Sequence, residues 1–182
     1  MNEKKEKIEV FDYTDHIMKA LRRGILLNTR GEKFNSMVIS WGHFGVIWGA
    51  PTFVVYVRES RYTKAQLDRT RAFTLSIPLG EPDAHIQQVC GMQSGHRIDK
   101  VREAGLTLAE PELNHTPGIR EYPMTLECEV LYAQKQDLSL LPEDIRSACY
   151  PQHVDGSAPL ANRDAHTAYI GRIVSAYILR DA

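Results

Sequence analysis

The chain has 182 residues, of which 22 are Lys or Arg and 23 are Asp or Glu, giving a formal net charge of -1. This length predicts a single domain over residues 1–182, with a core large enough to need no disulfide or metal. The balanced charge argues against a protein whose main task is to bind nucleic acid. The absence of any apolar run of about 20 residues argues against a membrane-spanning protein.

The cysteines and the N-terminus bear on the cellular compartment. Cys90, Cys128 and Cys149 are widely spaced and form no CxxC pair, so neither a zinc knuckle nor a dithiol redox site is indicated. Residues 1–10 are charged and lack the apolar run of a signal peptide, and we expect them to form a flexible extension. A reducing, cytoplasmic environment fits these features.

The first part of the chain predicts one helix followed by strands. The helix is expected in DYTDHIMKAL, with Thr14 as its cap and Gly24 at its end. Strands are expected in GILLNT and SMVISWG, joined by a turn at RGEK. A glycine-rich corner follows, and then a strand in TFVVYV. Trp41 and Trp48, at the ends of that corner, are expected to be core aromatics.

The second part mixes short helices with two longer strands. Helices are expected in SRYTKAQLDRTR, PDAHIQQVCG and RIDKVREAG, with a strand in FTLSIP after the first of them. From Met124 to Val130, apolar residues alternate with polar ones, which predicts a strand with one buried face. The last strand is expected over residues 168–179. Residues 137–164 are loop-rich, and a connection of that length is expected to cover a site.

The order of these elements indicates the fold class. About six strands lie in neighbouring runs rather than in alternation with helices, which is typical of a mainly β fold. We therefore predict an antiparallel barrel with short helices at its corners.

The segment VRESRYT is a candidate anion site at the start of a predicted helix. Free backbone N–H groups at a helix N-terminus favour an anion, and guanidinium groups add bidentate recognition of a phosphate. The alternative is that the arginines are solvated and Thr63 is only a cap. The candidate residues are Arg58, Ser60, Arg61, Tyr62 and Thr63.

The segment CGMQSGHRIDK is a second polar corner. Its hydroxyl, glycine and cationic residues could donate to another part of an anionic ligand. The alternative is a plain turn between two helices, with Asp99 and Arg102 pairing at its surface. The candidate residues are Ser94, Gly95, His96, Arg97 and Lys100.

The strand segment at SMVIS is a candidate platform for a planar ligand. The backbone amides of a strand edge can bond the polar rim of a heterocycle while apolar side chains cover its face. The alternative is an ordinary core hairpin. The candidate residues are Ser36, Met37, Val38, Ile39 and Ser40.

The remaining motifs narrow the possible chemistry. The seven histidines show no HxH, HxxxH or HExxH spacing, so no metal site is predicted. His166 could point into a pocket as a hydrogen-bond donor or acid, or lie partly exposed at the end of a strand. No GxSxG, P-loop or GxGxxG motif is present, so a nucleotide cofactor would have to be held in another way.

Three blocks of the sequence resemble the flavin reductase-like, FMN-binding split-barrel proteins, and the flavoredoxin branch in particular. The first block is the most specific, and together they span most of the chain from Gly24 to Tyr177. The blocks are NSMVISWGHFGVIWGAPTFVVYVRESRYT, CGMQSGHRIDKVREAGL and HTAYIGRIVSAY.

The resemblance implies a homodimeric split β-barrel that binds FMN non-covalently near the subunit interface, with NAD(P)H as the reductant. It places His166 near the nicotinamide and flavin face. The residues matching the flavin-ring strand are Asn35, Ser36, Met37, Val38, Ile39 and Ser40. Those matching the phosphate corner are Arg58, Ser60, Arg61, Tyr62 and Thr63, and those matching the second corner are Ser94, Gly95 and Lys100.

The sequence departs from the family pattern at two places. Val38 stands where the family often has Thr, so a hydroxyl near the ring is lost although the backbone donors remain. The family pattern SGRDxDK is replaced by SGHRIDK, which leaves the roles of His96 and Arg97 open.

The leading hypothesis is an FMN-dependent oxidoreductase that moves reducing equivalents from NAD(P)H. One alternative is a flavoredoxin-type electron carrier fed by a protein partner. Another is a non-catalytic barrel that binds a different phosphorylated ligand. Neither a nucleic acid nor a membrane is expected as a partner.

Overall fold

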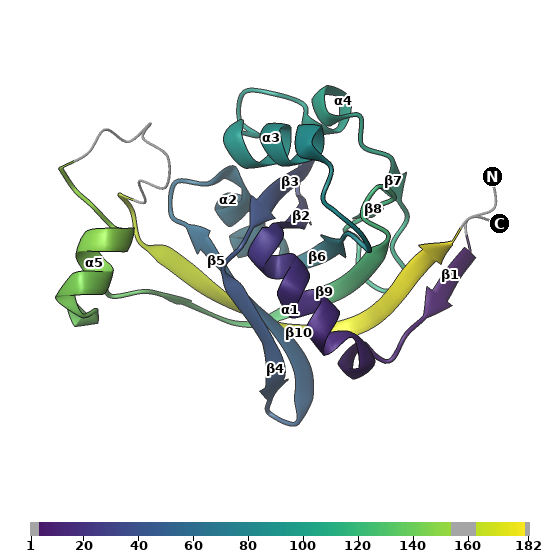
Figure 1. The fold of residues 1–182 in the computed structure, drawn as a ribbon, viewed down its shortest axis with the longest axis horizontal. Helices are drawn as coiled ribbons and strands as arrows, with labels where there is room; N and C mark the ends of the chain where they lie inside the picture. The colour runs from purple at the N-terminus through teal and green to yellow at the C-terminus, as the bar shows by residue number, and fades with distance from the viewer. Residues whose placement is uncertain (1–3, 154–162, 181–182) are drawn as a thin grey trace.

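The computed structural model describes residues 4–153 and 163–180. Within these residues the chain forms an eight-stranded antiparallel sheet, a small two-stranded sheet and five α-helices (Figure 1). The predicted mainly β fold class is therefore confirmed. Part of the predicted site-covering connection, residues 154–162, lies outside the described residues.

The large sheet contains β1 (Lys4–Lys7), β2 (Ile25–Arg30), β3 (Phe34–Ile39), β4 (Gly42–Ile47), β5 (Ala50–Arg58), β6 (Ala72–Ile77), β9 (Met124–Lys135) and β10 (His166–Arg180). The small sheet pairs β7 (Leu108–Ala109) with β8 (Gly118–Ile119). The helices are α1 (Thr14–Arg23), α2 (Tyr62–Thr70), α3 (Ala84–Met92), α4 (Lys100–Ala104) and α5 (Glu143–Cys149). Two 3-10 turns, Val10–Tyr13 and Leu138–Leu140, precede α1 and α5.

The strands of the large sheet follow the order β3-β2-β6-β9-β10-β5-β4, and β1 pairs with β10 beyond β5. Among the described residues no pairing joins β3 to β4, and the antiparallel sheet with short helices at its corners agrees with the predicted split-barrel fold. The long strand β10 crosses the molecule and bends where its pairing with β9 shifts register after Ile170 (Figure 1). Gly171 lies at this shift and lets the Phe73 ring approach the strand closely, because a Cβ there would lie 2.5 Å from that ring.

Two hydrophobic clusters occupy opposite faces of β2. Ile25 and Leu27 point into the main core, which α1 covers with Ile17 and Leu21. Leu26, between them, points the other way into a second core that α3 and the segment around β8 cover. This double burial holds α3 against the sheet next to β3, where the candidate site lies.

The glycine-rich corner predicted after residue 41 is a strand. β4 pairs antiparallel with β5, and the hairpin turns at Trp48 and Gly49, whose φ values are 54° and 72°. Trp41 is 38% exposed and Trp48 is 67% exposed, so the prediction that both are core aromatics is wrong. The turn places Trp48 at the hairpin tip, beyond the reach of either core.

Three other local predictions differ from the structure. Lys4–Lys7 form β1 against β10, so these residues are not a free extension as predicted for residues 1–10. α1 begins at Thr14 itself, whose hydroxyl donates to the Phe11 carbonyl instead of capping the helix. The connection after residue 137 contains the helix α5, although the sequence predicts a loop-rich segment there.

No helix among residues 4–153 and 163–180 has the length and apolar character needed to cross a lipid bilayer.

Candidate functional site

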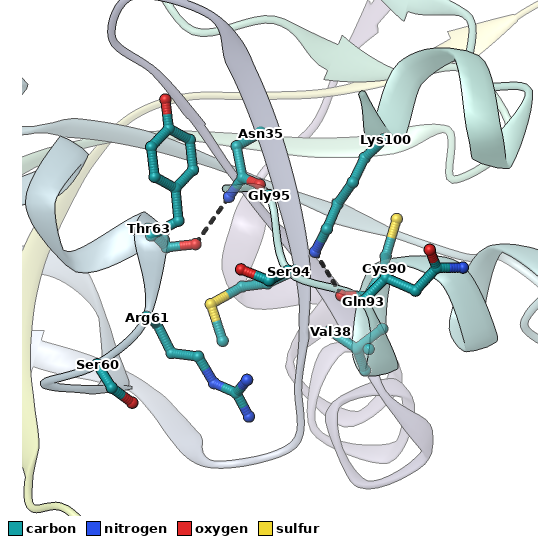
Figure 2. Close-up of a pocket in the computed structure, with 13 residues that line it drawn as sticks. Asn35, Val38, Ser60, Arg61, Thr63, Cys90, Gln93, Ser94, Gly95 and Lys100 are labelled. Atoms are coloured by element: carbon teal, nitrogen blue, oxygen red, sulfur yellow. Dashed lines mark hydrogen bonds between the residues drawn. The ribbon is translucent and has the colours of Figure 1, made fainter. Parts of the chain in front are cut away.

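The three candidate segments of the sequence, VRESRYT, CGMQSGHRIDK and SMVIS, meet at one pocket. It has a volume of about 440 Å³, including the part open to solvent, and lies between β3, the start of α2 and the end of α3 (Figure 2). The lining residues are Asn35, Met37, Val38, Ser60, Arg61, Tyr62, Thr63, Cys90, Gly91, Gln93, Ser94, Gly95 and Lys100.

The open edge of β3 forms one wall. β3 is the last strand of the sheet on this side and pairs only with β2 among the described strands. The Ser36 carbonyl bonds the Lys100 ammonium rather than β2, so it faces the open edge. In an antiparallel strand the N–H and C=O of one residue point to the same side. The N–H groups of Ser36 and, two residues on, Val38 therefore face outward as available donors.

Arg61 supplies the positive charge at the second wall. Among the described residues its guanidinium makes no hydrogen bond or ion pair, and as the N-cap residue of α2 it gives that helix no side-chain cap. The exposed N–H groups of the first turn therefore accompany a cation in the same pocket. Burial and the neighbouring charge of Arg58 lower the pKa of Arg61. A bound anion would offset the repulsion between the two guanidinium groups.

Arg58 has a different role from the one predicted, because it does not line the pocket. Its Nε and Nη2 both donate to Asp164 Oδ1 at 2.7 Å. Asp164 Oδ2 also accepts the backbone N–H of Ser60 at 2.7 Å, so this carboxylate ties the phosphate corner to the start of β10. Burial raises the pKa of Asp164, but the bonds from Ser60 and Arg58 outweigh it and leave that pKa below its ordinary value.

Asn35 links the first wall, β3, with the second wall at the start of α2 and with the turn before α4. Its Nδ2 donates to Thr63 Oγ1 at 2.8 Å, so the Thr63 hydroxyl serves this contact and not a helix cap. Its Oδ1 is buried without a hydrogen-bond partner among the described residues. A Cβ at Gly95 would lie 2.1 Å from this oxygen and 2.9 Å from the Tyr62 ring. Only glycine permits so close an approach (Figure 2).

Lys100 lies at the third wall and is only 4% exposed. Its ammonium donates to the carbonyls of Ser36 and Cys90 at 2.8 Å each. Burial lowers the pKa of Lys100 to about 8; the nearby Cys90 opposes this shift and the charge of Arg61 adds to it. The predicted surface pair of Asp99 and Arg102 is replaced, because the Asp99 carboxylate caps α4 and Arg102 pairs with Glu103.

Several predicted site residues lie outside the pocket lining. They are Ser36, Ile39, Ser40, Arg58, His96, Arg97 and His166. The Ile39 side chain belongs to the main core, and Ser36 contributes its backbone. Sequence reasoning missed Cys90, Gly91 and Gln93, which line the pocket from the end of α3. Residues of these types at a helix end carry no signal of ligand binding. No group of His, Cys, Asp or Glu within the described ranges could hold a metal ion.

His166 belongs to an aromatic cluster beside Arg58. It is 6% exposed, and its ring lies 4.9 Å from the ring of Trp41. The Tyr150 hydroxyl donates to Gln136 Oε1 at 2.9 Å and lies 3.0 Å from His166 Nδ1. Because the hydroxyl has one proton, Nδ1 carries the hydrogen in this arrangement and Nε2 is an acceptor. Burial, with the charge of Arg58, lowers the pKa of His166 to about 4.

We expect His166 to titrate near pH 4 when its ring signals are followed by NMR. Between this value and the ordinary pKa of about 6.5, the unfolded chain binds the additional proton. The contribution of His166 to the free energy of unfolding should therefore fall as the pH falls through this range. His166→Gln should remove this dependence of the free energy of unfolding on pH, because Gln does not titrate. A midpoint near 6.5 in the folded protein would contradict the buried, neutral ring and restore an acid role at neutral pH.

Comparisons with known proteins agree on one family. A family model described as flavin reductase like domain matches residues 18–182. Flavoredoxin of Desulfovibrio vulgaris (Miyazaki F) has a TM-score of 0.63 and 22% identity, covering 85% of this chain and 68% of its own. An FMN-binding domain of a flavin reductases-like enzyme from Shewanella baltica OS155 has a TM-score of 0.59 and 17% identity, and the match covers 97% of this chain and 77% of that one.

A third structure with the same fold is an NADH:FAD oxidoreductase from Streptomyces globisporus, with a TM-score of 0.60 and 12% identity, covering 90% of this chain and 83% of its own. No curated protein sequence matches the chain. At these identities the solved structures establish a shared fold.

Proposed function

The chain belongs to the flavin reductase-like domain family, and we propose that it is an FMN-dependent oxidoreductase that takes reducing equivalents from NAD(P)H. The observation that carries this proposal is the convergence of three segments on one pocket. A strand edge with outward N–H groups, a helix start with Arg61 and a tight turn at Gly95 line the same space.

The pocket residues fit a flavin nucleotide. The outward N–H groups of Ser36 and Val38 suit the polar edge of a flat ring, and the Met37 and Val38 side chains offer apolar cover. The buried Oδ1 of Asn35 has no donor within residues 4–153 and 163–180 and suits a ligand N–H or hydroxyl. Arg61 and the α2 N-terminus suit a phosphate.

Bound FMN would supply the redox chemistry by accepting a hydride from NAD(P)H and passing on one or two electrons. The protein's own residues bind and orient. The β3 donors would stabilise negative charge that develops at the ring edge, because they are fixed before the reaction. Arg61 would hold the phosphate by charge-assisted hydrogen bonds. His166, neutral at physiological pH, would offer an acceptor and not a proton.

A second candidate is an electron carrier of the flavoredoxin kind, favoured by the fold shared with flavoredoxin. Such a carrier would bind the same cofactor but receive electrons from a protein partner. A homodimer is proposed for either function. The exposed side chains of Val46 and Trp48 on the β4–β5 hairpin support it, because exposed apolar groups often mark interfaces. A cytoplasmic location stays a prediction from the sequence.

Two spectroscopic measurements test the proposed function. The purified protein, or the protein mixed with FMN, should show the flavin absorbance spectrum of a bound cofactor. Anaerobic addition of NADH or NADPH should then bleach the flavin colour. A spectrum that persists through excess reduced nicotinamide would refute the reductase and favour the electron carrier. Failure to bind FMN would favour a barrel that binds another phosphorylated ligand.

A further inference from the structure

We propose that Lys100 is a positioning residue for the flavin ring: its ammonium ties the end of α3 to the open edge of β3, and it does not bind the flavin phosphate. This inference rests on the proposed function and assigns Lys100 a role different from that of Arg61. Both residues line the same pocket and both are cations, so their roles have to be separated by geometry.

The contacts of Lys100 point inward to the protein backbone. The Nζ atom lies 2.8 Å from the Ser36 carbonyl on β3 and 2.8 Å from the Cys90 carbonyl in α3. The second carbonyl belongs to the last turn of α3, where helix carbonyls lack partners within the helix and favour a cation. One buried ammonium thus satisfies acceptors on two different walls of the pocket.

The bond to Ser36 has a direct consequence for the proposed ring-binding edge. The N–H and C=O of Ser36 face the same side of β3, so the ammonium that holds the carbonyl also fixes the direction of the outward edge. The bond to Cys90 fixes the distance between this edge and Gly91, which lies so close to Val38 that an added Cβ would be 3.5 Å from its side chain. Loss of the ammonium would leave two buried carbonyls without a donor and allow the walls to shift.

The two cations lie in different parts of the pocket. Figure 2 shows Arg61 beside Ser60 at one end, and Lys100 beside Cys90 and Gln93 at the other. The helix N-terminus that suits a phosphate is at the Arg61 end. A phosphate held there would use the guanidinium, which makes no other hydrogen bond or ion pair among the described residues. The Lys100 ammonium already makes two.

The charge state of Lys100 can be changed by pH without mutation. The titratable or charged groups that face it are Cys90 on α3 and Arg61 before α2, while β3 presents only neutral side chains to the pocket. Asp99, next in the chain, is occupied as the cap of α4. Since the pKa of Lys100 is about 8, mildly alkaline solution removes one proton and the positive charge, and the neutral amine that is left makes weaker hydrogen bonds to both carbonyls.

The test compares FMN with riboflavin, which has the same ring and ribityl chain but no phosphate. Lys100→Met keeps an unbranched side chain that is one atom shorter and removes the ammonium. We expect it to weaken the binding of both flavins by a similar factor of roughly tenfold or more. Arg61→Ala should weaken FMN alone. Lys19→Met, at an exposed i,i+4 pair on α1, controls for the loss of one positive charge and should change neither.

A pH titration of wild-type protein gives a second measurement that needs no variant to fold. Riboflavin affinity should fall as the pH rises from about 7 to about 9, and a fall should also occur in Arg61→Ala, displaced to higher pH because the charge of Arg61 no longer lowers the pKa of Lys100. In folded Lys100→Met this dependence should disappear. Loss of FMN binding alone in Lys100→Met would overturn the inference in favour of a phosphate contact. Unchanged riboflavin affinity in the variant, or a flat pH profile in the wild type, would also overturn it. Wild-type protein that binds neither flavin would instead refute the proposed function.

Discussion

Arg61→Ala is expected to weaken FMN binding by about 1.5–3 kcal/mol, roughly 10- to 150-fold in Kd, because a charge-assisted phosphate contact is lost. The guanidinium lines the pocket at the start of α2, and no other side chain in the described ranges pairs with it. Titration of the variant with FMN, followed by flavin fluorescence, measures the change. Riboflavin affinity should stay within about threefold of the wild-type value, since it has no phosphate to lose.

Arg58→Ala provides a contrast within the same segment. The sequence predicts an equal phosphate contact from Arg58, but the structure pairs this side chain with Asp164 outside the pocket lining. Removing the Arg58 side chain should loosen the loop at Ser60, which Asp164 holds. FMN binding would then change because the loop shifts, not because a direct bond to the phosphate is lost. Arg69→Ala, on the exposed side of α2, is the matched control and should leave Kd unchanged. Wild-type FMN affinity in Arg61→Ala would remove the phosphate assignment.

The parts of the site that could be predicted from sequence are those in which residue type and position act locally. Arg61 and Ser60 precede a helix, and this order alone indicates an anion site. The predicted hairpin places β3 beside β2, whereas the lack of a second partner for β3 among the described strands is known only from the order of the sheet. Asp164 could not be found in this way, because its role depends on the pairing of β10 with β5, which brings it back to Arg58 from the far end of the chain.

The limits of the fold prediction have a similar origin. The hairpin of β4 and β5 was hidden because glycine and tryptophan dominate β4, and these residues resemble a corner or a core segment when read locally. The alternation in β9 correctly predicts a strand. It does not reveal that β9 lies between β6 and β10 with structure on both faces, so the prediction of one buried face is wrong.

Glu127 shows what this second buried face contains. The residue is 0% exposed, although its place in the alternation predicts a solvent-facing side chain. Its carboxylate accepts the backbone N–H groups of Glu112, Leu113 and Asn114 at 2.6, 2.8 and 2.9 Å. A buried carboxylate with three backbone donors fixes the loop that crosses the sheet between the small strands β7 and β8. The charge is tolerated there because these donors replace water.

Glu127→Gln is therefore expected to lower the free energy of unfolding by about 2–4 kcal/mol, because an amide N–H₂ would face at least one backbone N–H and leave it unpaired. For a chain of this size the melting temperature should fall by roughly 5–15 °C. Thermal and urea denaturation measure the change. Glu129→Gln is the matched control on the same strand. The Glu129 carboxylate pairs with Arg172 and both side chains are about half exposed, so the loss should stay below about 1 kcal/mol. Equal, small losses at both positions would contradict the role of Glu127, because a carboxylate that solvent could replace would behave like its exposed neighbour.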